Sequence, residues 1–304
     1  MMMISGNWAT LLLPIDTDES IDFVRLEAEL EALTAAGMDG VYSNGSAGEF
    51  HCQTEAEYDS VQMLLAETCE EAGTPFIIGA CHTDPLVSAG RVARAAALRP
   101  SAIQVILPDW VTVTDAEAVD FMAMMRENAG GIPLVLYNPP HAKRVLSPRA
   151  LRQLLDTAPD VVGVKLGDGD AAWYDEARQW LSGVALFVPG HHLATGVREG
   201  VAAGAFSNVA CLSPIGAQKW TDSMTEDLEG ALELESRIQR FMDDYIVPFK
   251  LKHGYCNAAL DKLLAAVGGW APVGTRLRRP YRWIDQEMVP RIRQAARDLV
   301  PELV

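Results

Sequence analysis

A lysine closes a short apolar run at 161–168, whose sequence is VVGVKLGD. Small and β-branched residues here predict a strand that is buried on both faces, as in parallel sheets. An ammonium group buried in such a strand must pair with a carboxylate or lose its proton, because its desolvation is costly. A neutral Lys165 would be a nucleophile that can form a Schiff base with a carbonyl substrate. Taken alone, this stretch favours the structural interpretation, in which Lys165 reaches solvent or pairs with Asp168 or Asp170.

Two other stretches carry groups suited to the same chemistry. The segment 43–50 (SNGSAGEF) contains Gly45 and Gly48, which free the backbone to turn N–H groups toward a substrate carboxylate. An ordinary loop would have the same composition. Tyr137 ends the apolar run 133–137 and precedes two prolines. Its phenol can shuttle a proton, or it can be a buried hydroxyl with a hydrogen-bond partner, as most buried tyrosines are.

A pair of histidines marks a further stretch, the tetrapeptide PGHH at 189–192. It lies where a helix is expected to begin. Adjacent side chains on a turn point in different directions, so at most one of His191 and His192 is expected to face a site. A solvent-exposed position for both is equally compatible with the sequence.

The elements that must position these residues alternate regularly along the chain. Helical patterns begin with capping boxes at 54–57 and 114–117, and with a cap residue before proline at 147–148. Eight strand-then-helix units, with no G-x-G-x-x-G after the first strand, predict a (β/α)8 barrel rather than an open sheet. Active sites of such barrels lie at the C-terminal ends of the strands, where Lys165 and Tyr137 fall. The strand-like apolar runs are 8–13, 40–42, 75–80, 102–107, 133–137, 161–165, 185–188 and 204–210.

The pattern changes in the last quarter of the chain, where no further strand is predicted. Long amphipathic stretches at about 226–249, 255–267 and 281–299 predict helices. We therefore expect residues 1–225 to form the barrel and residues 226–304 to form a helical extension packed on it.

Composition limits the class of partner. The formal net charge of -16 argues against nucleic acid and anionic membranes, so a small molecule is the expected ligand. The longest apolar runs are too short to span a bilayer, and the first residues lack the features of a signal peptide, which predicts a cytoplasmic protein. Five scattered cysteines without a C-x-x-C pair indicate buried thiols rather than disulfides or a zinc site.

Taken together, several of these motifs resemble those of one known family. The segments 45–49 (GSAGE), 137–140 (YNPP) and 163–165 (GVK), with Gly190 and 204–207 (GAFS), are similar to those of the dihydrodipicolinate synthase and N-acetylneuraminate lyase family of class I aldolases. The resemblance covers nearly the whole chain. It implies a TIM barrel with a C-terminal helical extension, assembled as a homo-oligomer, either a dimer or a tetramer.

The same resemblance implies roles for individual residues. Lys165 would form the imine with a 2-oxo acid such as pyruvate, and Tyr137 would be the proton shuttle. Imine formation makes the substrate's C2 an electron sink, so that no metal and no organic cofactor is needed. The expected substrate-binding positions are Ser46, Ala47, Gly48, Trp110, Gly190, His191 and Phe206.

The proton relay departs from that of dihydrodipicolinate synthases. Those enzymes have two adjacent threonines in the turn, where this chain has Ser46 and Ala47. The tyrosine that a neighbouring subunit lends to their site aligns with Trp110, whose indole donates a hydrogen bond but cannot relay a proton. Two hydroxyl groups of the relay are therefore absent.

The pocket for the second substrate also departs from the family pattern. The arginine that binds a carboxylate there aligns with Ala142, although Lys143 and Arg144 follow directly. His191 and His192 stand where an acidic residue follows Gly190 in the family. We therefore expect a hydroxylated second half of the substrate in preference to an amino-acid-derived aldehyde.

The sequence thus predicts a Schiff-base lyase, an aldolase or dehydratase acting on pyruvate or a 2-keto-3-deoxy sugar acid. A true dihydrodipicolinate synthase and a non-catalytic 2-oxo-acid-binding protein remain alternatives. A metal-dependent barrel aldolase would leave Lys165 unexplained, and no spacing among its candidate ligands resembles a ligand motif. Those candidates are His82, His141, His191 and His192.

Overall fold

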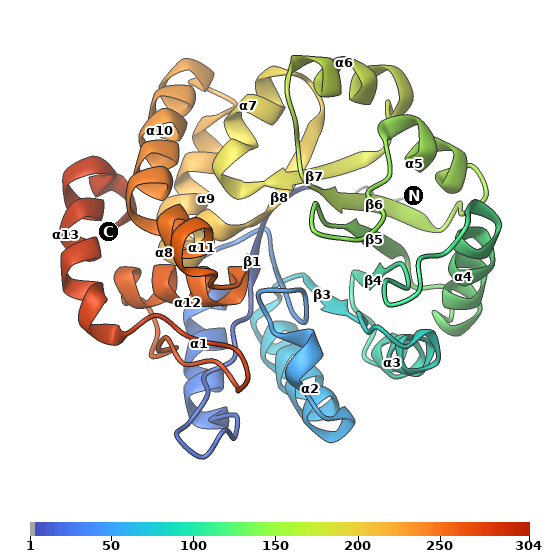
Figure 1. Ribbon diagram of the computed structural model, residues 1–304, viewed down its shortest axis with the longest axis horizontal. Coiled ribbons are helices and arrows are strands. Elements are labelled where there is room, and N and C mark those ends of the chain that lie inside the picture. The colour runs from blue at the N-terminus through green and yellow to red at the C-terminus, as the bar shows by residue number, and fades with distance from the viewer. Residues whose placement is uncertain (1–3) are drawn as a thin grey trace.

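The computed structural model describes residues 4–304 and shows eight parallel strands closed into a barrel, in the order β1 to β8 (Figure 1). Helices alternate with the strands and surround them, so the predicted TIM barrel is confirmed. The strands are β1 Gly6–Thr10, β2 Gly40–Tyr42, β3 Phe76–Gly79, β4 Ala102–Ile106, β5 Leu134–Asn138, β6 Val161–Leu166, β7 Ala185–Pro189 and β8 Ala202–Ser207.

Two predicted strands, the first and the last, extended too far toward their carboxyl ends. The run 8–13 was taken as a strand, but β1 ends at Thr10 and the buried residues 11–13 continue as irregular chain. The run 204–210 was likewise wrong beyond Ser207, whose hydroxyl accepts a hydrogen bond from the backbone N–H of Ala210 and caps a short helix. Apolar periodicity alone does not separate a buried strand from a buried helical turn.

The predicted helix starts are confirmed at three places. Capping boxes close on Thr54 and Thr114, and Ser147 accepts a hydrogen bond from the backbone N–H of Ala150. The helices that flank the strands are α1 Phe23–Ala35, α2 Glu55–Ala72, α3 Pro85–Ala97, α4 Asp115–Asn128, α5 Pro148–Leu155, α6 Ala171–Trp180, α7 Leu193–Arg198, α8 Asn208–Leu212 and α9 Pro214–Ser223. Short 3-10 turns lie at Phe50–Cys52 and Gly190–His192.

Helices alone follow α9, drawn in orange to red in Figure 1. The stretch predicted as one helix at 281–299 is helical only from Val289, because residues 281–285 are irregular and a 3-10 turn follows them. A π-helical turn at Met242–Ile246 joins two of these helices. The helices are α10 Leu228–Phe241, α11 Val247–His253, α12 Asn257–Gly268 and α13 Val289–Leu299, with short turns at Gln286–Met288 and Pro301–Leu303.

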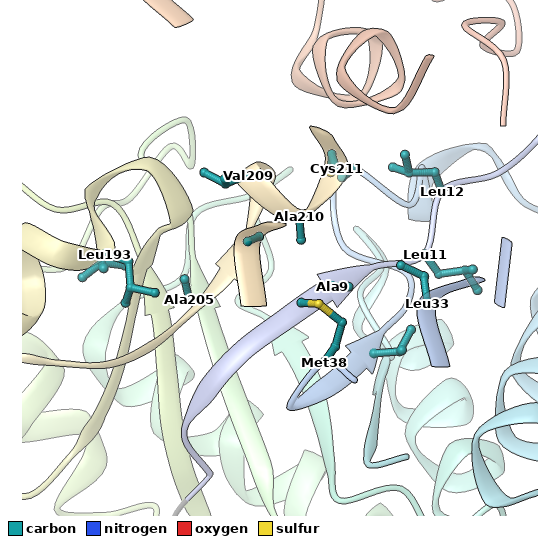
Figure 2. Packing of buried hydrophobic residues seen from close by; sticks show 14 of the residues in the cluster. Ala9, Leu11, Leu12, Leu33, Met38, Leu193, Ala205, Val209, Ala210 and Cys211 are labelled. Atoms are coloured by element: carbon teal, nitrogen blue, oxygen red, sulfur yellow. The ribbon is translucent and has the colours of Figure 1, made fainter. Parts of the chain in front are cut away.

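The barrel and the later helices share one apolar core. Figure 2 shows Val209, Ala210 and Cys211 of α8 close to the end of β1, where Ala9 and Leu11 lie. On its other side α8 packs against α12. This packing seats α12 at the carboxyl end of the barrel. In the part of the chain that the structure covers, we find no helix with the length and apolar character needed to cross a membrane.

Candidate functional site

A cavity of about 390 Å³ opens at the carboxyl ends of the strands, where active sites of such barrels lie. Two sets of residues line it. The first, which we call the strand wall, comes from the strand ends and their loops and includes Tyr42, Ser46, Ala47, Tyr137, Lys165, Gly190, His191, Phe206 and Asn208. The second, which we call the helical wall, comes from residues 242–261 and includes Met242, Ile246, Lys250, Asn257, Leu260 and Asp261.

Lys165, near the end of β6, projects into the cavity among aromatic rings. Its Nζ donates to the hydroxyl of Tyr42 at 3.2 Å. It also lies 4.5, 4.4 and 5.0 Å from the ring centroids of Tyr42, Tyr137 and Phe206. Burial lowers the pKa of Lys165 to about 8. This amine is therefore neutral in roughly a tenth of molecules at pH 7.

The alternative in which Lys165 pairs with Asp168 or Asp170 is not what the structure shows. Asp168 accepts hydrogen bonds from His192 at 2.6 Å and from Tyr174 at 2.8 Å. Asp170 caps α6 through the backbone N–H of Trp173. Among residues 4–304, no carboxylate forms an ion pair with Lys165. The structure therefore leaves Lys165 without either of the two carboxylate partners that the structural interpretation assigned to it.

Tyr137, on β5, borders the same space as Lys165. Its hydroxyl lies 3.3 Å from the hydroxyl of Ser46. Burial raises the pKa of Tyr137 to about 12, although the Ser46 hydroxyl opposes this rise. At neutral pH the phenol therefore keeps its proton and is able to donate it.

The turn after β2 presents Ser46 and Ala47 to the cavity. Asn44 and Glu49 take left-handed backbone conformations, with φ of 58° and 52°, and so fold the turn tightly. A Cβ at Gly48 would lie 2.8 Å from the backbone nitrogen of Asn44, so only glycine fits there. Gly48 is not among the lining residues, and its part is to let the turn close.

An ion pair from α12 fixes this turn from behind. The Nζ of Lys262 lies 2.5 Å from a carboxylate oxygen of Glu49, and the side chains are 0% and 2% exposed. Lys262 also donates to the backbone carbonyl of Arg276 at 2.6 Å. The sequence analysis did not find this pair, although Lys262 interrupts an apolar helical stretch much as Lys165 interrupts an apolar strand.

Of the two histidines after β7, only His191 lines the cavity. Its Nδ1 lies 2.9 Å from the amide nitrogen of Asn208. Burial and the neighbouring His192 lower the pKa of His191 to about 4, so this ring is neutral at pH 7. His192 instead contacts Asp168, whose hydrogen bond raises the pKa of His192. Gly190 permits this packing, since a Cβ there would lie 2.6 Å from the hydroxyl of Ser207.

Trp110, in the loop after β4, lies outside this cavity and is 80% exposed. The Nζ of Lys143 donates to its backbone carbonyl at 2.9 Å and lies 4.8 Å from its ring. Arg144 donates to the carbonyl of Val113 at 2.7 Å and lines a separate cavity of about 140 Å³ behind Tyr137. Neither cation that follows Ala142 lines the space beside Lys165.

The helical wall carries polar groups that the sequence analysis did not consider. Lys250 donates to the side-chain oxygen of Asn257 at 2.9 Å. Burial raises the pKa of Asp261 to about 7, against the opposing effects of Lys165 and Lys250. The signal for Asp261 was present in the sequence, because an acidic residue interrupts an otherwise apolar run in AALDKLLAAV. Within residues 4–304, no group of three or more His, Cys, Asp or Glu side chains is arranged to hold a metal ion.

Sequence comparison relates this chain to a known family. The profile of the dihydrodipicolinate synthetase family matches residues 3–299. The N-acetylneuraminate lyase of Salmonella typhimurium is 24% identical over 311 residues, which cover 98% of this chain and 98% of the lyase.

Solved structures with similar folds come from the same group. A prophage protein of the dihydrodipicolinic acid synthase family from E. coli K12, solved with pyruvate, superposes with a TM-score of 0.85 at 18% identity and 100% coverage of both chains. The Clostridium difficile protein CdNal, solved with mannosamine, gives a TM-score of 0.84 at 17% identity, covering 98% of this chain and 100% of its own. At these identities the likeness shows the fold.

Proposed function

Because the chain belongs to the dihydrodipicolinate synthetase family, whose members are lyases, we propose that it acts through an imine between Lys165 and a 2-oxo acid. The observation that carries this proposal is the setting of the Lys165 amine. It lies among three aromatic rings, without a carboxylate partner in the described chain, and has a pKa of about 8. A substantial neutral fraction at physiological pH is what a Schiff-base nucleophile requires.

The strand wall supplies the remaining groups for this step. The turn that carries Ser46 and Ala47 receives the carboxylate of the 2-oxo acid. Tyr137 gives its proton to the departing oxygen as the carbinolamine loses water, since a phenol with a pKa of about 12 is protonated at neutral pH. The resulting iminium accepts the electron pair when a bond at C3 breaks.

The second half of the substrate is best described as hydroxylated. Ala142 offers no clamp for a carboxylate, and Lys143 and Arg144 bind backbone carbonyls outside the Lys165 cavity. His191 and Asn208 offer neutral hydrogen-bonding groups at its wall instead. A 2-keto-3-deoxy sugar acid therefore fits better than an aldehyde derived from an amino acid. The similarity to N-acetylneuraminate lyases, named for a sugar acid, supports this choice.

A panel of 2-keto-3-deoxy sugar acids, other 2-oxo acids and aldehydes, followed by pyruvate release or consumption, tests the proposal. We expect pyruvate release from at least one sugar acid. Lys165→Arg should lower this rate at least about a thousandfold, since arginine cannot form the imine. The matched control is Lys252→Arg, an exposed lysine of α11 that is not part of the cavity, and it should keep wild-type activity.

Two outcomes contradict this assignment. Efficient condensation of pyruvate with aspartate semialdehyde, at a rate matching any cleavage or dehydration, would make the protein a dihydrodipicolinate synthase. Imine formation without turnover across the panel would make it a non-catalytic 2-oxo-acid-binding protein.

We also propose a homo-oligomer in which Trp110 lies at a subunit contact. A large aromatic side chain that is 80% exposed at the mouth of the barrel is typical of an interface anchor. Sedimentation should show a dimer or tetramer, and Trp110→Ala should weaken it. A wild-type monomer at micromolar concentration would contradict this proposal.

A further inference from the structure

Asp261 is an acidic residue in the helical wall of the catalytic cavity. It lies one turn into α12, which begins at Asn257. Its carboxylate borders the same space as the amine of Lys165, while its neighbours on that wall include the apolar side chains of Ile246 and Leu260. A carboxylate on an apolar wall needs an explanation, because its desolvation is costly unless a partner compensates.

The structure gives Asp261 no such partner. Among residues 4–304, no hydrogen bond or ion pair engages its side chain, although the next residue, Lys262, is tied to both Glu49 and the carbonyl of Arg276. Lys165 and Lys250 both favour the charged form of Asp261 but neither contacts it directly. The open space between the Asp261 carboxylate and the Lys165 amine is the space a substrate bound to Lys165 would fill.

The titratable groups in this cavity differ in their protonation state at neutral pH, and therefore in whether they can donate or accept a proton. Tyr137, with a pKa of about 12, is a donor, and His191, with a pKa of about 4, is a weak base. Burial raises the pKa of Tyr42 well above its usual value, and the same holds for Cys211, so both are protonated. Asp261, with a pKa of about 7, populates its ionised and protonated forms together. A group with this property both accepts and returns a proton efficiently.

We propose that Asp261 is the catalytic base for the half of the substrate that leaves as an aldehyde. This inference rests on the proposed imine chemistry of Lys165 and adds a second catalytic group to it. It places proton transfer on the helical wall, opposite the wall where Tyr137 serves imine formation.

The step balances without any further reactant. The Asp261 carboxylate takes the proton of the C4 hydroxyl, the O–H electrons form the C4 carbonyl, and the C3–C4 bond breaks. Its electron pair forms the C2–C3 double bond of an enamine as the iminium on Lys165 becomes neutral. The aldehyde leaves, C3 takes up the proton that Asp261 had accepted, and water hydrolyses the imine to release pyruvate and restore the lysine and the Asp261 carboxylate.

Asp261→Asn tests this role, because the amide keeps the size of the side chain and cannot take a proton. We expect the variant to form the borohydride-reduced pyruvate adduct at Lys165 to the wild-type extent. Cleavage of the preferred sugar acid should fall by about a hundredfold, as is typical when a general base is lost. In the wild type, kcat should also fall as pH drops below about 7, and this limb should be absent in the variant. Asp244→Asn, an exposed carboxylate of the π-helical turn, is the matched control and should behave as the wild type.

Each outcome decides the question. Cleavage by Asp261→Asn within about twofold of the wild type, with the same pH profile, overturns the role of Asp261. Loss of the pyruvate adduct in the folded variant also overturns it, since Asp261 would then serve imine formation. If the variant does not fold, a wild-type kcat that stays constant from pH 5 to 8 overturns the proposal. Failure of the wild type to form any adduct refutes the imine chemistry itself and is thus distinguishable.

Discussion

The two walls of the cavity differ in the elements that form them, in their chemical groups and in how far each could be predicted from the sequence. The strand wall is made by β-strand ends and tight turns, and it holds the amine of Lys165 among aromatic rings. The helical wall is made by segments that follow the barrel, and it combines apolar side chains with Asp261 and Lys250. The first wall contains the groups that we propose act on a 2-oxo acid. The second faces whatever the 2-oxo acid is joined to, so it is where we expect substrate choice to be made.

A buried ion pair also connects the two walls. Lys262, directly after Asp261, forms a buried ion pair with Glu49, which ends the turn that carries Ser46 and Ala47. We therefore expect a change on α12 to affect both Asp261 and the turn that carries Ser46 and Ala47. If the proposed chemistry holds, we expect the later helices to be part of the catalytic unit.

The largest expected effect follows from removing the Lys262–Glu49 ion pair. Lys262→Met leaves the Glu49 carboxylate buried without its partner, which typically costs about 3–5 kcal/mol of stability. Urea denaturation monitored by circular dichroism measures this loss. Glu302→Gln, which removes one partner of the half-exposed pair with Arg237, is the control and should cost about 0–1 kcal/mol. Equal losses in the two variants would show that the walls are not coupled through Lys262.

Removing the hydroxyl of Tyr137 is expected to impair chemistry on the strand wall alone. Tyr137→Phe should slow turnover by about a hundredfold while leaving pyruvate binding largely intact, because the lost group donates a proton rather than holding the substrate. Steady-state kinetics and pyruvate titration provide the two readouts. Tyr58→Phe on α2, a residue that does not line the cavity, is the control. An unimpaired Tyr137→Phe enzyme would remove this residue from the mechanism.

The pH dependence of pyruvate capture should follow the protonation of Lys165 on the strand wall. Only the neutral amine attacks, and burial lowers the pKa of Lys165 to about 8. The second-order rate of capture should therefore rise about tenfold per pH unit below that value and level off above it. Quenching with borohydride at short times measures this rate. A rate that still climbs steeply between pH 9 and 10 would mean that Lys165 keeps an ordinary lysine pKa.

A smaller effect is expected at the edge of the helical wall. Lys250→Gln removes a charged hydrogen-bond donor that lines the cavity, so KM for a substrate with a hydroxylated distal end should rise by about tenfold. Pyruvate capture at Lys165 should not change. Lys252→Gln, an exposed lysine on the same helix, supplies the comparison. If Lys250→Gln weakened pyruvate capture as much as it raised KM for the full substrate, the two walls would not serve different parts of the substrate.

The sequence predicted most of the strand wall and little of the helical wall. Lys165 and Tyr137 sit at strand ends, so strand periodicity gave their positions directly. The helical wall depends on how α11 and α12 dock on the barrel, and no local pattern specifies that docking. Asp261 and Lys262 were nevertheless signalled as charges in an apolar helical run, the same signal that drew attention to Lys165. The errors at 11–13 and 208–210 arose because buried runs look alike whether they form strands, turns or helices.

The most direct test of this account is to locate the covalent adduct that borohydride traps with pyruvate. The cavity contains two lysines, Lys165 on the strand wall and Lys250 on the helical wall, so peptide mass mapping has an internal control. We predict the mass of one reduced pyruvate adduct on Lys165 and an unmodified Lys250. An adduct on Lys250, or no adduct with any 2-oxo acid in the folded protein, would contradict the assignment of the imine to the strand wall.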